Sequence, residues 1–301
     1  MRHFLKLSDL SKEELISILD LADELKQKRK NKIPHKLLKD KSLGMIFTKS
    51  STRTRVSFEV GMYELGGNAL FLSSDNTQMG RGEPIEDTAR VLSRYLDGIM
   101  IRTYDQIEVE TLAKYSDVPV INGLTDFSHP CQVAADLMTI RERLGTLEGK
   151  KLCYIGDGNN MANSLIVGCI KTGMEVSVAC PAEYMPDEEV VRRALETGKL
   201  NLTTDAAKAA EGADVLYTDV WASMGKENEI KQRREAFAGY QINDEIMSCA
   251  AEGAMVLHCL PAHKGEEITE KVFEEHAGEI FDESENRLHV QKAIMVKLMS
   301  D

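Results

Sequence analysis

Short apolar runs alternate with amphipathic stretches along the whole of this chain. In the first half the apolar runs predict strands at Ser42–Thr48, Asn68–Ser74, Gly98–Thr103 and Pro119–Leu124. In the second half they predict strands at Lys151–Gly156, Glu175–Cys180, Val215–Val220 and Ala254–Leu260, with a weaker candidate near Asn201–Thr204. Because strands that alternate with helical patterns form parallel sheets covered by helices on both faces, this pattern predicts an α/β fold.

The helical stretches divide these strands into two sets. The first helix is expected to open at a capping box, Ser11-Lys-Glu-Glu14, and the helical stretch Val133–Leu144 separates the two sets of strands. We therefore predict two doubly wound parallel-sheet domains joined by helices, at residues 1–133 and 134–285. A last helix, at about Asn286–Met299, follows the second set, and its periodicity does not indicate on which domain it packs.

Composition narrows the range of partners. The formal net charge of the 301 residues is −12, which argues against nucleic acid or an anionic membrane surface as a partner. No apolar run approaches the ~18 residues of a membrane span, and the N-terminus lacks the pattern of a signal peptide. The six cysteines show no CxxC pair and no metal-binding spacing, as expected for reduced thiols in a cytoplasmic protein.

The segment Ser50–Arg55 (SSTRTR) lies between a predicted strand and a helical pattern at Val56–Leu65. The first N–H groups of a helix lack intrahelical partners and carry a positive partial charge, which favours an anion. Arginine adds forked donors that match phosphate oxygens. The alternative is a Ser/Thr helix cap with two solvated arginines.

Several other predicted strands also end in polar residues. These residues are Arg102, the segment Thr125–Gln132 with His129, Asp157-Gly-Asn-Asn160, Asp219, and His258-Cys259. Each has a structural alternative: a satisfied histidine, a surface ion pair, a capping aspartate or a buried thiol. Ligands of open α/β sheets bind beyond the carboxyl ends of the strands, so the coincidence at several strand ends favours a binding site.

Two nucleotide-binding motifs are excluded. Gly156-x-Gly158 resembles a dinucleotide turn, but Met161 replaces the third glycine, and the next strand ends in Ala179-Cys-Pro181 without an acidic residue for a ribose. The chain also lacks the GxxxxGK[ST] pattern of a P-loop. We expect neither a nicotinamide cofactor nor P-loop chemistry.

Five segments together resemble the aspartate/ornithine carbamoyltransferase family. They are Phe47–Arg55, His129-Pro-Cys-Gln132, Gly156–Asn160, Asp219-Val-Trp-Ala-Ser-Met-Gly225 and His258-Cys-Leu-Pro-Ala262, and the resemblance extends from about Leu5 to about Met299. It implies a carbamoyl-phosphate domain followed by a domain for the second substrate, with the helix at about 286–301 packed back on the first domain. It also implies a homotrimer, or a multiple of trimers, with sites at subunit boundaries, and no cofactor or metal.

The resemblance also assigns roles to individual positions. It implies carbamoyl-phosphate binding by Ser51, Thr52, Arg53, Thr54, Gln78, Arg102, His129, Gln132, Cys259, Leu260 and Arg287, with Gln78 reaching a neighbouring subunit's site. It implies ornithine binding by Leu124, Asn160, Asp219, Ser223 and Met224. The catalytic set it implies is Arg102, His129, Asp219, Cys259 and Arg287.

The implied reaction is transfer of a carbamoyl group from carbamoyl phosphate to the δ-amine of ornithine, in arginine metabolism. A tetrahedral oxyanion would form, which Arg102, His129 and Arg287 could stabilise. Two alternatives stay open: a different acceptor, such as aspartate, putrescine or an N-acylated ornithine, and a non-catalytic protein that binds a phosphorylated ligand.

Overall fold

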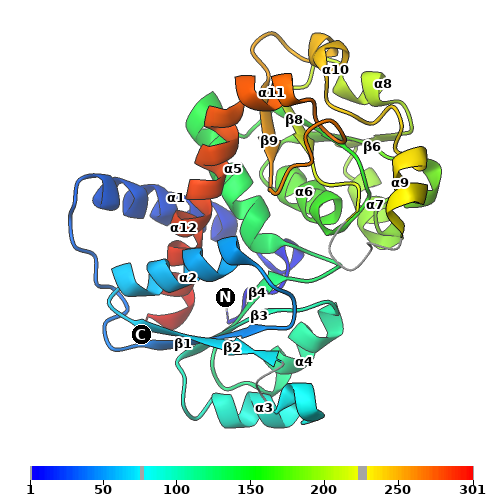
Figure 1. Ribbon diagram of the computed structural model, residues 1–301. Coiled ribbons are helices and arrows are strands. Elements are labelled where there is room, and N and C mark those ends of the chain that lie inside the picture. Colours follow the sequence, from blue (N-terminus) through cyan, green and yellow to red (C-terminus); the bar gives the residue numbers. More distant parts are fainter. Residues whose placement is uncertain (1, 75–77, 223–228, 301) are drawn as a thin grey trace. The chain divides into compact units, whose positions relative to one another are not determined.

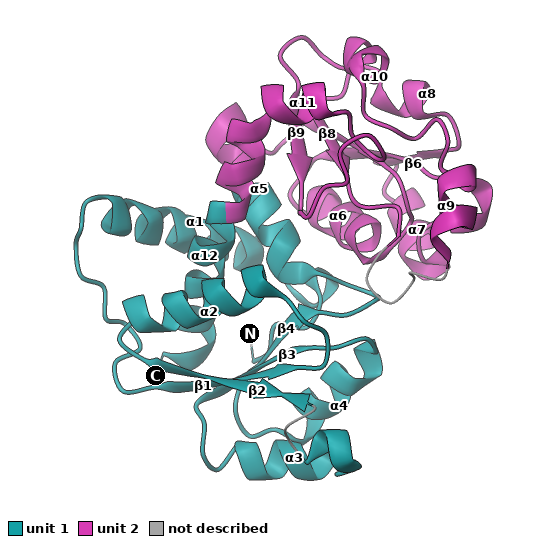
Figure 2. Ribbon diagram, viewed as in Figure 1, with its two compact units in different colours: residues 1–138, 285–301 teal, residues 139–284 magenta. Residues whose placement is uncertain are grey.

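The computed structural model describes residues 2–74, 78–222 and 229–300. The described Cα positions divide into two compact units, residues 1–138 with 285–301 and residues 139–284 (Figure 2). The boundary falls within helix α5 (Pro130–Leu144), five residues after the predicted boundary at 133/134. None of the described helices combines the length and apolar character that a bilayer span requires.

The first unit contains a parallel sheet in the order β2-β1-β3-β4 among the described residues. Its strands are β1 (Ser42–Phe47), β2 (Asn68–Ser73), β3 (Gly98–Arg102) and β4 (Val120–Leu124). Its helices are α1 (Lys12–Lys30), α2 (Thr52–Glu64), α3 (Ile85–Leu92) and α4 (Gln106–Tyr115), with the short turns η1 (Leu7–Asp9) and η3 (Met79–Arg81). Helix α2 covers one face of the sheet, and α3 and α4 lie on the other (Figure 1).

The second unit contains a parallel sheet in the order β7-β6-β5-β8-β9. Its strands are β5 (Lys151–Ile155), β6 (Glu175–Ala179), β7 (Leu200–Thr203), β8 (Val215–Thr218) and β9 (Met255–His258). Its helices are α6 (Asn160–Lys171), α7 (Glu188–Leu195), α8 (Ala206–Ala210), α9 (Ile230–Ala236), α10 (Asp244–Cys249) and α11 (Glu270–Glu275), with the turn η4 (Ala182–Tyr184). The α/β prediction is confirmed, and each predicted strand is present to within two residues at either end.

The capping box that the sequence predicts at α1 is also present. The Ser11 hydroxyl accepts a hydrogen bond from the Glu14 N–H at 3.1 Å, and the Glu14 carboxylate accepts one from the Ser11 N–H at 2.9 Å. This exchange satisfies two of the N–H groups that the first turn leaves unpaired.

Three predicted helix starts are wrong, and the smallest error is that of α5, which begins at Pro130 rather than at Val133. Helix α2 begins at Thr52 rather than Val56, because Ser51 is its N-cap and accepts a hydrogen bond from the Thr54 N–H at 3.2 Å. The last helix, α12 (Ala277–Met299), begins well before Asn286. Its first turns carry buried carboxylates that pair with strand β9, as described for Glu283 below, and sequence periodicity does not show such contacts.

Candidate functional site

Each sheet has a topological switch point, which lies between two neighbouring strands whose following connections lead to opposite edges of the sheet. In the first unit this switch point lies between β1 and β3, and in the second it lies between β5 and β8. Ligands of doubly wound sheets bind beyond the carboxyl ends of the strands at such points. The segments that leave these strands carry SSTRTR, Arg102, Gly156–Asn160 and Asp219, so the topology places the predicted residues of each unit at its own switch point.

At the first switch point, the polar motif forms the first turn of α2. Thr54 is fully buried, and its hydroxyl oxygen accepts hydrogen bonds from Arg287 Nη2 at 2.8 Å and from the Ser51 hydroxyl at 3.1 Å. Arg55, in contrast, is exposed, pairs with Glu59 and lies over the ring of Phe71 at 3.9 Å. The alternative of two solvated arginines therefore describes Arg55 in part.

His129 lies among positive charges at the same end of the first unit. The ring is buried, and burial, followed by the charges of Arg287, Arg102, Lys49 and Arg53, lowers the pKa of His129 well below its ordinary value of 6.5. The imidazole is therefore neutral near pH 7 and adds no positive charge of its own to those of its neighbours. Four cations near one buried ring, in a chain of net charge −12, favour an anionic ligand at this end of the first unit.

Other predicted residues of this unit adopt clear positions. Arg102 ends β3 and is 6% exposed, and its carbonyl accepts the Thr48 N–H at 2.9 Å, which joins the ends of β1 and β3. Gln132 is buried in the first turn of α5, where its amide donates to Asp136 at 2.8 Å. Leu124 ends β4 and is buried, whereas Gln78 is exposed.

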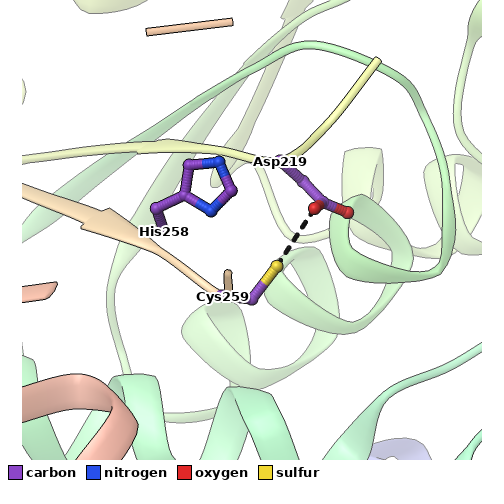
Figure 3. Close-up of side chains that lie close together, drawn as sticks. All are labelled: Asp219, His258 and Cys259. Atoms are coloured by element: carbon purple, nitrogen blue, oxygen red, sulfur yellow. Dashed lines mark hydrogen bonds between the residues drawn. The ribbon is translucent and has the colours of Figure 1, made fainter. Parts of the chain in front are cut away.

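At the second switch point, Asp219 is the centre of a small hydrogen-bonded cluster. Its Oδ1 accepts the Val220 N–H at 2.8 Å and the Cys259 thiol at 3.1 Å, a bond drawn in Figure 3. Its Oδ2 accepts the side-chain amide of Asn159 at 2.9 Å. The sequence singled out Asn160 but not Asn159, because nothing local to the β5–α6 turn shows that a side chain there meets the end of β8.

Strand β9 ends in a backbone that buried polar groups hold in place. Leu260 has φ of 58°, a left-handed conformation that costs a non-glycine residue roughly 1–2 kcal/mol. Its N–H donates to His258 Nδ1 at 2.9 Å, and His258 Nε2 pairs with Glu267 at 3.0 Å. The His258 N–H donates to Glu283 of α12 at 2.9 Å. Sequence reasoning missed Glu267 and Glu283 because both act through long-range contacts.

Among the described residues, two groups of three side chains have the composition of a metal site, and one of them is His263, Glu266 and Glu267, of which His263 is exposed. Asp219, His258 and Cys259 each place one ligand atom within 4.8 Å of the others. Both ring nitrogens of His258 are already engaged, however, since Nδ1 accepts the Leu260 N–H and Nε2 pairs with Glu267. A metal would have to break one of these bonds, so the described geometry fits an orienting role better than a ligand role.

The six thiols fall into two groups. Cys131, Cys153, Cys169 and Cys180 are buried, and burial raises the pKa of Cys131 and of Cys153 to about 12. Cys249 and Cys259 are partly exposed. The predicted substrate-facing thiol, Cys259, is thus accessible, while the four buried thiols behave as core residues.

Gly156 and Gly158, whose spacing resembles that of a dinucleotide-binding turn, have a structural role in this protein. Gly156 has φ of 145°, and Gly158 lies against the chain at Tyr184–Pro186, where its N–H donates to the Tyr184 carbonyl at 2.8 Å. A Cβ at Gly158 would lie 2.3 Å from backbone atoms of Met185 and Pro186. The motif is therefore explained by close backbone packing around the turn that presents Asn159 and Asn160.

We expect Gly158→Ala to lower the free energy of unfolding by about 3 kcal/mol, since rigid backbone must move to admit the methyl group. Chemical denaturation monitored by circular dichroism measures this change. Gly278→Ala is the matched control, because no atom lies within 4 Å of its Cβ position and it stands in helix α12. Equal stability of the two variants would contradict the packing argument.

Two predicted positions, Ser223 and Met224, lie outside the described residues. The segments that flank them line a pocket of about 540 Å³ on the second unit. Its walls include Trp221, Ile230, Arg233, Pro261 and His263. Arg233 is buried and donates to Asp157 at 2.7 Å and to the Trp221 carbonyl at 2.8 Å.

Two parallel α/β units, each with polar side chains at the carboxyl ends of its central strands, are typical of two-domain enzymes of the α/β class. Comparison of the sequence with known protein families gives a match for each unit. Residues 2–142 match the carbamoyl-P binding domain, and residues 148–298 the Asp/Orn binding domain, of aspartate/ornithine carbamoyltransferase. The chain belongs to the aspartate/ornithine carbamoyltransferase family.

Individual relatives are similar over their full length. The chain is 57% identical over 300 residues to the ornithine carbamoyltransferase of Syntrophotalea carbinolica, covering 99% of each. Among solved structures, the ornithine carbamoyltransferase from Pyrococcus furiosus has a TM-score of 0.94 and 51% identity, covering 99% of this chain and 97% of that one. The anabolic enzyme from Campylobacter jejuni has a TM-score of 0.93 and 44% identity, covering 99% of both chains.

Proposed function

We propose that this protein transfers the carbamoyl group of carbamoyl phosphate to the δ-amine of L-ornithine, giving L-citrulline and phosphate. The observation that carries the proposal is the set of cations around His129, which includes Arg53 in the first turn of α2. The two family domains and the names of the full-length relatives support the same reaction.

In this proposal the first unit binds carbamoyl phosphate. The N-terminus of α2, with Ser51 to Thr54, holds the phosphate, and Arg102 contacts both phosphate and carbonyl oxygen. Neutral His129 donates a hydrogen bond to the carbonyl oxygen without protonating it, because its pKa is far below 7. Arg287 and Gln132 complete the contacts to the carbamoyl group, and Gln78 contacts the phosphate in a neighbouring subunit.

The second unit binds ornithine in the same proposal. Asp219 accepts from an ammonium group of the substrate, and Asn160, Ser223 and Met224 complete the contacts from this unit, while Leu124 is a proposed contact from the first unit. The lone pair of the δ-nitrogen attacks the carbamoyl carbon, a C–N bond forms, and the C–O bond to phosphate breaks. Phosphate leaves with that electron pair and takes up the proton that the nitrogen loses, so the products are citrulline and hydrogen phosphate. Preorganised donors at the developing oxyanion supply the main stabilisation.

A citrulline assay tests the proposal directly. Purified protein with carbamoyl phosphate and L-ornithine is expected to form citrulline, and Arg53→Ala is expected to raise the KM for carbamoyl phosphate more than that for ornithine. Aspartate, putrescine and N-acetylornithine serve as competing acceptors in parallel. If one of these compounds is carbamoylated and ornithine is not, the proposed acceptor is wrong. If no acceptor gives a product, a non-catalytic protein that binds a phosphorylated ligand is favoured.

Cys259 is proposed to tune the protonation of the substrate amine through its bond to Asp219. A free alkylammonium has a pKa near ~10, so deprotonation limits the rate at neutral pH. We expect Cys259→Ser to raise the KM for ornithine by about tenfold and to shift the pH–rate profile, since its hydroxyl bonds differently to the carboxylate. Steady-state kinetics between pH 6 and 10 measure both, and unchanged values would refute this role.

We also propose a homotrimer, or a multiple of it, working in arginine biosynthesis in the cytoplasm. The first unit exposes apolar side chains on α2 and the edge strand β2, namely Val56, Tyr63, Leu70 and Phe71. An unpaired apolar edge of this kind favours burial against another copy. The relative from Campylobacter jejuni is named anabolic, which supports the biosynthetic direction.

A further inference from the structure

Asn159 makes two kinds of contact from one side-chain amide. Its oxygen caps helix α6, accepting the Met161 N–H at 2.8 Å and the Ala162 N–H at 3.4 Å. Its nitrogen donates to Asp219 Oδ2 at 2.9 Å. One short side chain therefore joins the start of α6 to the carboxylate that follows β8.

The cap determines which way the amide points. A flipped amide would set its NH₂ against the helix N–H groups and its carbonyl against the carboxylate, which would lose every one of these hydrogen bonds. The nitrogen of Asn159 therefore faces Asp219 whenever α6 is capped. Loss of the helix cap would cost about 1 kcal/mol. The cap therefore holds the amide in the orientation in which its NH₂ group donates to Asp219.

The remaining contacts of Asp219 show what this donor adds. Oδ1 is held by the Val220 N–H and the Cys259 thiol, both from segments that end β8 and β9. Asn159 is the partner of Oδ2 among the described residues. Without it, the carboxylate is held at one oxygen and is free to rotate about its Cβ–Cγ bond.

We propose that Asn159 is a positioning residue for substrate binding: it fixes the plane of the Asp219 carboxylate so that Oδ2 presents its remaining lone pair to an ammonium group of the acceptor. This inference rests on the proposed function, because the acceptor is ornithine. Asn159 does not itself touch substrate. Its neighbour Asn160 projects from the first helical position, so one turn supplies both a substrate contact and the support for another.

Asn159→Ser separates positioning from capping. Serine caps helices as well as asparagine does, but it is shorter and lacks the second polar atom, the NH₂ group, through which Asn159 reaches Asp219. We expect the KM for ornithine to rise by 10- to 100-fold, the range for losing a hydrogen bond to a charged group, while the KM for carbamoyl phosphate stays within twofold. The thermal midpoint is expected to change little.

Asn159→Asp gives a second, pH-dependent readout. Aspartate keeps the cap and places a second carboxylate against Asp219, and two adjacent carboxylates share one proton at low pH and repel when both ionise. The ratio of the variant's ornithine KM to that of the unsubstituted protein is therefore expected to grow as pH rises from 6 to 9. A role confined to capping would give a constant ratio.

Asn243→Ser is the matched control. Asn243 caps α10 through the Ile246 N–H at 3.0 Å and is not among the partners of Asp219. It is expected to leave both KM values unchanged. The inference is overturned if Asn159→Ser leaves the ornithine KM within twofold, or if it raises both KM values together with a loss of stability. Absence of citrulline with the unsubstituted protein would instead overturn the proposed function.

Discussion

Replacing Arg102 by methionine is expected to lower kcat for citrulline formation by about 10³-fold, the upper range for removing one donor at a developing oxyanion. Methionine is of similar length and apolar, so the buried position stays filled while the charge is lost. The backbone bond from the Thr48 N–H to the Arg102 carbonyl does not depend on the side chain, so β1 and β3 stay joined. Single-turnover measurements at saturating substrates test this directly.

The same variant has a spectroscopic consequence. Arg102 is one of the charges that lower the pKa of His129, after burial and Arg287. Its removal is expected to raise that pKa toward 6.5, which a nuclear magnetic resonance titration of the His129 ring detects. If the Arg102 guanidinium did not act on the His129 ring, its removal would leave the titration of His129 unchanged.

Arg90→Met is the control for charge loss on the same unit. Arg90 is exposed and pairs with Asp87 within one turn of α3, so its removal is expected to change kcat by less than twofold. Arg102→Lys adds a further comparison, since lysine restores the charge without the forked donors. An Arg102→Met enzyme with kcat within tenfold of the unsubstituted protein would exclude the role proposed for this side chain.

Most strands were predictable from sequence because they are largely buried, apolar runs, as parallel strands are, whereas β2 and β7 are partly exposed. The first residues of the helices were harder to predict from the sequence. Residues Ala277–Glu285 are largely polar, yet they are helical because Glu279 accepts the Val256 N–H at 2.9 Å and Glu283 accepts the His258 N–H and the Tyr217 hydroxyl. Such tertiary contacts override local periodicity.

The residues of the candidate site also fall into two groups, those that the sequence predicted and those that it did not. Ser51, Thr54 and Arg102 were found because strand ends and helix starts are visible along the chain. Asn159 and Glu267 were not, because each acts on a residue that is distant in sequence or hidden by the fold. The residues proposed to contact a ligand thus left a local signal, whereas the supporting contacts that Asn159 and Glu267 make did not.

Glu267→Ala is expected to affect both stability and activity, because Glu267 holds the backbone that follows β9. The carboxylate is fully buried, and its Oε1 accepts from His258 Nε2 at 3.0 Å and from the His263 N–H at 2.5 Å. Truncation leaves two donors unpaired in or near the interior, at about 1–3 kcal/mol for each buried one. We expect the free energy of unfolding to fall by about 3 kcal/mol.

Activity is expected to fall further than stability explains. His258 holds the Leu260 N–H, and Leu260 keeps its left-handed conformation only while its surroundings impose it. Once His258 is released, Leu260 relaxes and the neighbouring Cys259 thiol shifts relative to Asp219. A displacement of about 1 Å at a reacting group costs on the order of 10²-fold in rate, so kcat/KM for ornithine is expected to fall by about that factor.

Glu267→Gln distinguishes backbone support from charge. Glutamine keeps an oxygen in the place of Oε1, so both donors stay paired, and its NH₂ replaces Oε2, which has no partner among the described residues. We therefore expect glutamine to recover most of the stability and most of kcat/KM, measured at a temperature where every variant is folded. Equal losses in the alanine and glutamine variants would show that the charge of Glu267, rather than its hold on the Leu260 backbone, is what the site requires.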